Sequence, residues 1–108
     1  MKAQIKVASY DTSMWDGFAR KECQEAVYVV QAGEGIDTAG MGAPYRFEIT
    51  GVRADAVDLA VRPNLWLQAE EGGRVVGALT LAVGERACLQ TQSFDAWGHW
   101  VVTVEGIE

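Results

Sequence analysis

The chain has 108 residues and a formal net charge of −6, from 9 basic and 15 acidic side chains. This length predicts one domain, residues 1–108, with a core large enough to fold without metals or disulfides. The acidic balance argues against nucleic-acid binding, because neutralising phosphates requires an excess of Lys and Arg.

Cysteine use and hydropathy predict where the protein works. The chain has two cysteines, Cys23 and Cys88, which are too few for a disulfide scaffold. No apolar run reaches membrane-spanning length, and no signal-peptide core follows Met1. We therefore predict a cytoplasmic protein with reduced thiols and no membrane contact.

The first 31 residues show two different periodicities. Lys2–Ser9 alternates polar and apolar side chains, which predicts a half-buried strand. From Ser13 the apolar residues recur at helical spacing, so we predict a helix over 13–31. The run Ala26–Gln31 competes with this prediction because its Val and Tyr residues suit a strand. The helix then ends near Glu25.

The middle of the chain is less regular. Gly33–Pro44 contains four glycines and one proline without periodicity, which predicts a long loop. Tyr45–Thr50 alternates and predicts a strand. Val52–Arg62 fits either a short helix beginning at Arg53, which we favour, or a strand, and Pro63 is expected to end either one.

The C-terminal forty residues give the strongest signal. Four segments rich in Val, Leu, Thr and Trp are separated by Gly-containing turns, which predicts an antiparallel meander of consecutive hairpins. These segments are Leu65–Glu70, Arg74–Val83, Arg86–Phe94 and His99–Glu105.

The predicted register divides this meander into two faces. With the shortest loops, Leu81 lies opposite Cys88 and Leu89 lies opposite Val104. One face then carries small apolar side chains and Trp100. The other mixes Leu and Val with polar residues, which are Gln90, Gln92, His99 and Thr103. Half-buried amides need hydrogen-bond partners, so this second face predicts a subunit contact or a shallow pocket wall.

The predicted fold class is α+β. It consists of a mainly antiparallel sheet of about six strands, with the helix over 13–31 packed on one face. The alternative is an all-β sandwich or barrel in which Ala26–Gln31 is a strand.

Few residues point to catalysis. The sequence contains no pattern typical of a metal site, so no metal or cofactor is predicted. His99 is the single histidine, so any nucleophile–base pair must use it. The predicted register puts His99 about 17 Å from Cys88, which argues against a dyad. Trp97, predicted in a turn, is a candidate contact for a partner.

The favoured function is a non-catalytic, homodimeric module that binds a small, partly apolar or planar molecule. Its predicted site lies beneath the loop 33–44 and consists of Trp66, Gln90, Gln92, His99 and Thr103. One alternative is an acidic protein-interaction or inhibitor module that uses Trp97. A second alternative is a small enzyme that depends on His99.

Overall fold

The described part of the chain folds into β-strands joined by turns. A computed structural model describes residues 1–13, 17, 20–38, 45–69, 72–91 and 96–108, and no helix occurs among them. The α+β prediction is therefore wrong, and its all-β alternative gives the correct class. The strands are β1 (Ala3–Ser13), β2 (Arg20–Val30), β3 (Gly35–Thr38), β4 (Tyr45–Val52), β5 (Ala56–Ala69), β6 (Gly72–Ala82), β7 (Arg86–Gln90) and β8 (Ala96–Ile107).

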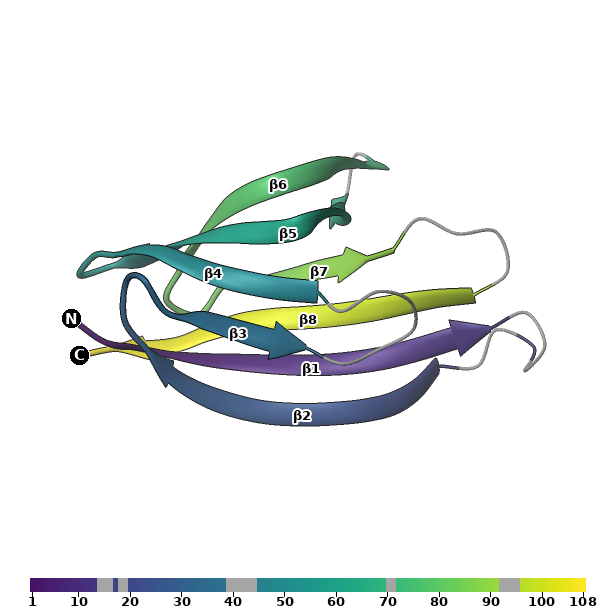
Figure 1. Cartoon of the computed structure of the whole chain (residues 1–108), viewed down its shortest axis with the longest axis horizontal. Coiled ribbons are helices and arrows are strands. Elements are labelled where there is room, and N and C mark those ends of the chain that lie inside the picture. The colour runs from purple at the N-terminus through teal and green to yellow at the C-terminus, as the bar shows by residue number, and fades with distance from the viewer. Residues whose placement is uncertain (14–16, 18–19, 39–44, 70–71, 92–95) are drawn as a thin grey trace.

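These strands form one antiparallel sheet that curls into a half-barrel (Figure 1). The order is β2-β1-β8-β7-β5-β4-β3, with β6 added to β5 outside this path. In Figure 1, β1 and β2 lie below, β5 and β6 lie above, and β3 and β4 lie in front. The two termini are side by side, where Glu108 N donates to Lys2 O at 2.8 Å.

The helix predicted over 13–31 is replaced by strand β2. Residues 14–16 and 18–19 lie outside the described part of the chain, but Arg20–Val30 pairs antiparallel with β1. Val27 and Val29 are each 56% exposed, whereas Val30 is 5% exposed. Side chains in this segment alternate, so the helical stripe was coincidental. The β-branched run forms a strand because β1 pairs with it along its length.

Two further segments predicted as loop or helix are strands. Within 33–44, Gly35–Thr38 forms β3 and Ile36 is buried opposite Phe47, while 39–44 lie outside the described residues. The helix predicted from Arg53 is wrong, because β5 runs through this region as the strand alternative expected.

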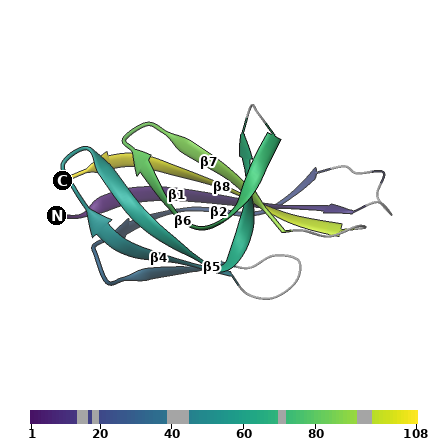
Figure 2. The ribbon, with the colours of Figure 1, turned by 90° about the horizontal axis from the view of Figure 1, so that it is seen from above.

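Pro63 does not end β5. The strand continues across it, with a cis peptide between Arg62 and Pro63, and its pairing with β6 shifts register between Ala60 and Leu65. A register irregularity is where a proline, which lacks an N–H group, is tolerated inside a sheet. Figure 2 shows that β5 bends along its length.

One hydrophobic core fills the inside of the half-barrel, and every strand contributes to it. The largest fully buried side chains are Trp100, Phe47, Ile5, Ile36, Ile49, Leu59, Leu65 and Leu89. The ring of Tyr45 contacts that of Trp100 across the interior, with centroids 4.7 Å apart. This contact ties the start of β4 to the middle of β8.

The predicted meander is only partly correct. The described strands β5 and β6 pair from Ala69 opposite Gly72, and β7 pairs with β8, so two of the predicted hairpins form. The hairpin between β6 and β7 does not. Within the described residues, β6 pairs with β5 alone, and β7 also pairs with the far end of β5 through Trp66 and Leu67. In Figure 1, β5 lies between β6 and β7.

Candidate functional site

The side of β7, β8 and β1 that faces away from the core is called the outer face here. Residues directly opposite each other in an antiparallel pair point to the same side, so the register defines rows across the strands. Three consecutive rows cover the outer face. They are Trp66–Gln90–His99–Tyr10, then Cys88–Val101–Ala8–Glu25, then Arg86–Thr103–Lys6–Val27.

Three of the predicted site residues become neighbours in the first row. Gln90 lies opposite both Trp66 on β5 and His99 on β8. Thr103 is on the same face but four residues further along β8, about 13 Å away at strand rise. Gln92 lies outside the described residues.

The predicted register of β7 and β8 is wrong by four residues, because Leu89 lies opposite Trp100 instead of Val104. Four is an even number, and side chains alternate with a period of two. The two predicted faces of these strands therefore survive the error. Leu89 and Trp100 are 1% exposed, while Gln90 and His99 on the other face are half-buried.

The outer face contains a hollow of about 330 Å³, which we call the outer-face hollow. Its floor is formed by the middle row, where Ala8, Val101 and Cys88 have short side chains. Longer side chains stand on either side. The complete lining is Lys6, Ala8, Tyr10, Glu25, Arg86, Cys88, Val101 and Thr103. Short side chains between Tyr10 on one side and Lys6 and Arg86 on the other explain why a flat sheet surface is indented here.

The charges at this hollow are partly neutralised. Lys6 Nζ lies 2.6 Å from Glu25 Oε1, and the hydrogen bond and charge of Glu25 raise the pKa of Lys6 above its ordinary value. Arg86 forms no ion pair with any side chain in the described part of the chain. The rim therefore keeps one guanidinium available to a ligand.

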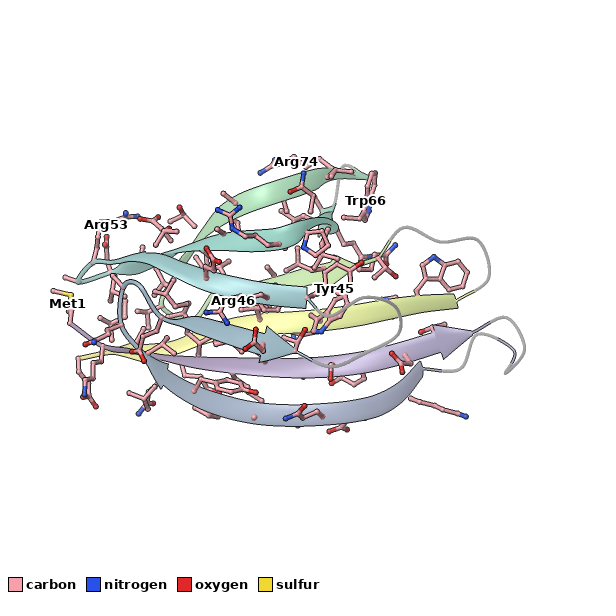
Figure 3. The ribbon with its side chains drawn as sticks, viewed as in Figure 1. Met1, Tyr45, Arg46, Arg53, Trp66 and Arg74 are labelled. Carbon is pink, nitrogen blue, oxygen red and sulfur yellow. The ribbon has the colours of Figure 1, made fainter. Side chains whose placement is uncertain are left out.

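The two tryptophans singled out in the sequence have different surroundings. Trp66 lies beside β6, where a Cβ on Gly73 would come within 2.6 Å of its Nε1 atom (Figure 3). Its indole therefore lies against β6. Trp97 belongs to β8 rather than to a turn, and it is half-buried opposite Thr12 on the outer face.

The histidine and the cysteine are closer than predicted. Cys88 lies opposite Val101, which places His99 diagonally across from it, at a Cα distance of about 7–8 Å. The separation of about 17 Å expected from the sequence is therefore wrong. Cys88 is a half-buried free thiol, and Nε2 of His99 is shielded from solvent. Among the described residues, no three His, Cys, Asp or Glu side chains gather where they could hold a metal.

The sequence analysis missed the contribution of β1 and β2 to this surface. Lys6, Tyr10 and Glu25 line the hollow, and none was singled out. The alternation of Lys2–Ser9 does place Lys6 on the polar side of its strand. The pairing of β1 with β8, about 95 residues away, leaves no mark in local spacing.

Comparison with family models, with curated proteins and with solved structures gives no match. In the described part of the chain, no helix has the length and apolar character needed to cross a membrane.

Proposed function

We propose that the chain is a non-catalytic binding module for a small, partly apolar or planar molecule that lies in the outer-face hollow. The observation that carries this proposal is the floor of short side chains, Ala8, Val101 and Cys88, on three adjacent hydrogen-bonded strands, with Tyr10 on one side and Lys6 and Arg86 on the other. A floor built on paired strands needs no rearrangement to receive a ligand, and its volume of about 330 Å³ is within the usual range of ligand sites.

The lining supplies both kinds of contact that such a ligand needs. Ala8 and Val101 offer an apolar floor for one face of a ring. Polar groups stand at both ends, with the Tyr10 phenol on one side and the Thr103 hydroxyl on the other. A planar molecule with hydrogen-bonding groups at its ends fits this arrangement best.

Filling the hollow tests the proposal. A set of planar aromatic compounds is titrated into ¹⁵N-labelled protein, and binding is expected to shift the backbone amides of Ala8, Val101 and Thr103. Val101→Trp places an indole over the floor and should remove these shifts. Val83→Trp, at a residue 46% exposed outside the hollow, is the control and should keep them. Shifts that occur elsewhere, or that persist in Val101→Trp, contradict the proposal.

The enzyme alternative gains support from one observation, which is the diagonal placement of Cys88 and His99. An imidazole that activated the thiol would raise its reactivity at neutral pH. The rate of Cys88 alkylation by iodoacetamide, compared between the native chain and His99→Gln, tests this. A large drop in rate favours the enzyme, and equal rates favour the binding module.

The homodimer and the cytoplasmic location also remain proposals. A polar outer face that is half-buried in one copy would suit contact with a second copy. Sedimentation equilibrium measures the oligomeric state, and fractionation of cells that express the chain measures its location.

A further inference from the structure

The hairpin that fails to form leaves a second hollow, which we call the wedge. β6 and β7 are consecutive and joined by the turn at Gly84, yet they diverge, and β7 meets the far end of β5 instead. A hollow of about 270 Å³ opens between the three strands. It lies on the other side of β7 from the middle of the outer-face hollow, and the two share only Arg86.

Part of the wall of the wedge is apolar. Leu81 and Ala87 are 5% and 4% exposed and belong to the core. Leu67 and Leu79 are partly buried and pack against that core. The exposed parts of Leu67 and Leu79 give the wedge an apolar strip that a short hydrocarbon chain would cover.

Two arginines at this wedge have no ion-pair partner in the described part of the chain. Arg46, Arg53 and Arg62 each form an ion pair with Asp37, Asp58 or Glu48. Among the described residues, Arg74 and Arg86 have no such partner, and both line the wedge. In a chain of net charge −6, two arginines at one hollow that form no ion pair with a described carboxylate are unexpected. Figure 3 shows Arg74 on β6 at the upper edge of the molecule.

Two other polar groups of the wedge are already engaged. Thr80 Oγ1 donates to Asp58 Oδ1 at 2.6 Å, and Glu85 Oε1 accepts from Ala82 N at 2.9 Å. The carboxylate of Glu85 is therefore held by the backbone of its own turn. Of the remaining polar groups, Gln68 carries an amide, and Arg74 and Arg86 carry charged donors that lie beside the leucines.

From these observations we infer that the wedge binds an anionic amphiphile, a carboxylate on a short aliphatic chain. Guanidinium groups match a carboxylate through paired N–H donors, and the leucines accept the chain. This inference goes beyond the proposed function, because it concerns a different hollow and an aliphatic rather than a planar ligand.

Octanoate is the probe, titrated into ¹⁵N-labelled protein with calorimetry in parallel. Binding should shift the amides of Leu79, Leu81 and Ala87. Acetate, which lacks the chain, and octanamide, which lacks the charge, should each bind at least ten-fold more weakly. Equal affinity for octanamide, or equal shifts with acetate, would overturn the inference, since either result means that the arginines and the leucines do not act together.

Arginine variants locate the site. Arg74→Gln should weaken octanoate binding about ten-fold, equivalent to about 1.4 kcal/mol, because one charge-assisted contact is lost. Arg74→Lys keeps the charge without the paired donors and should fall in between. Arg62→Gln removes the same charge outside the wedge and should change the affinity less than two-fold. If Arg74→Gln and Arg62→Gln weakened octanoate binding equally, only the overall charge of the protein would matter. That result would reject the site.

Val101→Trp separates this inference from the proposed function. It fills the outer-face hollow and leaves the wedge open, so octanoate binding should persist in it. Loss of octanoate binding in Val101→Trp, with Arg74→Gln unaffected, would place octanoate in the outer-face hollow and overturn the inference. If planar compounds fail to bind but octanoate behaves as described, the proposed function alone is wrong.

Discussion

The sequence predicts a hairpin at the turn between β6 and β7 and another at the connection between β7 and β8, but only the second forms in the structure. β7 pairs with β8 and not with β6. The difference comes from β5, whose 14 residues pair with β6 along their length and also pair with β7 at Leu67. Turn residues decide where the chain reverses, whereas ladder partners decide what lies beside it.

The largest loss of stability is expected for a core substitution on the side of β7 that is paired with its neighbouring strands. Leu89 is 1% exposed and lies opposite both Leu67 and Trp100. Leu89→Ala should lower the free energy of unfolding by about 2–5 kcal/mol, because a cavity forms that the sheet cannot close. The matched change on the open side, Leu79→Ala, should lower it by about half as much or less. Urea denaturation measures both, and equal losses would mean that the wedge is as tightly packed as the paired side.

An intermediate effect is expected where β5 and β6 pair. A Cβ on Gly73 would lie 2.6 Å from Trp66 Nε1 and 2.7 Å from the backbone oxygen of Leu67. Gly73→Ala should therefore destabilise the fold by about 1–3 kcal/mol, since the backbone atom cannot move aside cheaply. At Gly106 a Cβ would meet no atom within 4 Å, so Gly106→Ala serves as the control. Thermal unfolding of the two variants should differ clearly, and similar melting temperatures would contradict the close approach of Trp66.

The smallest effect is pH-dependent and concerns Asp58, which links β5 to β6. The hydrogen bond from Thr80, and then the one from Arg53, lower the pKa of Asp58 below its ordinary value. A lowered folded pKa means that this link stabilises the fold above about pH 4 and is lost as the pH falls through the folded value.

Asp58→Asn should therefore lower the melting temperature slightly at neutral pH and make no difference in strong acid. Asp55→Asn, an exposed aspartate in the adjoining turn, provides the charge-matched control. A difference between Asp58→Asn and the native chain that stayed constant down to strong acid would contradict the assignment.

The alternation of polar and apolar residues predicted strands where one face of the strand is apolar and the other faces solvent. Lys2–Ser9 and Tyr45–Thr50 are of this kind, and both are strands in the structure. Alternation also assigned the faces of β7 and β8 correctly, because a register error of four residues keeps each side chain on its own face.

Predictions from the sequence failed where pairing between distant segments determined the structure. The apolar residues of 13–31 fit a helix as well as a strand until β1 is placed beside them. The same limit applied to the candidate site. Gln90 and His99 were recognised from their face, but Lys6 and Arg86 meet only because β1 and β7 flank β8. No local pattern encodes that order.

The strand neighbours of β7 are the central claim, and nuclear Overhauser contacts between backbone protons measure them directly. The structure predicts contacts between Leu67 and Leu89 and between Trp66 and Gln90, with none between Leu81 and Cys88. Contacts between Leu81 and Cys88, in the absence of those from β5, would close the wedge and contradict the account.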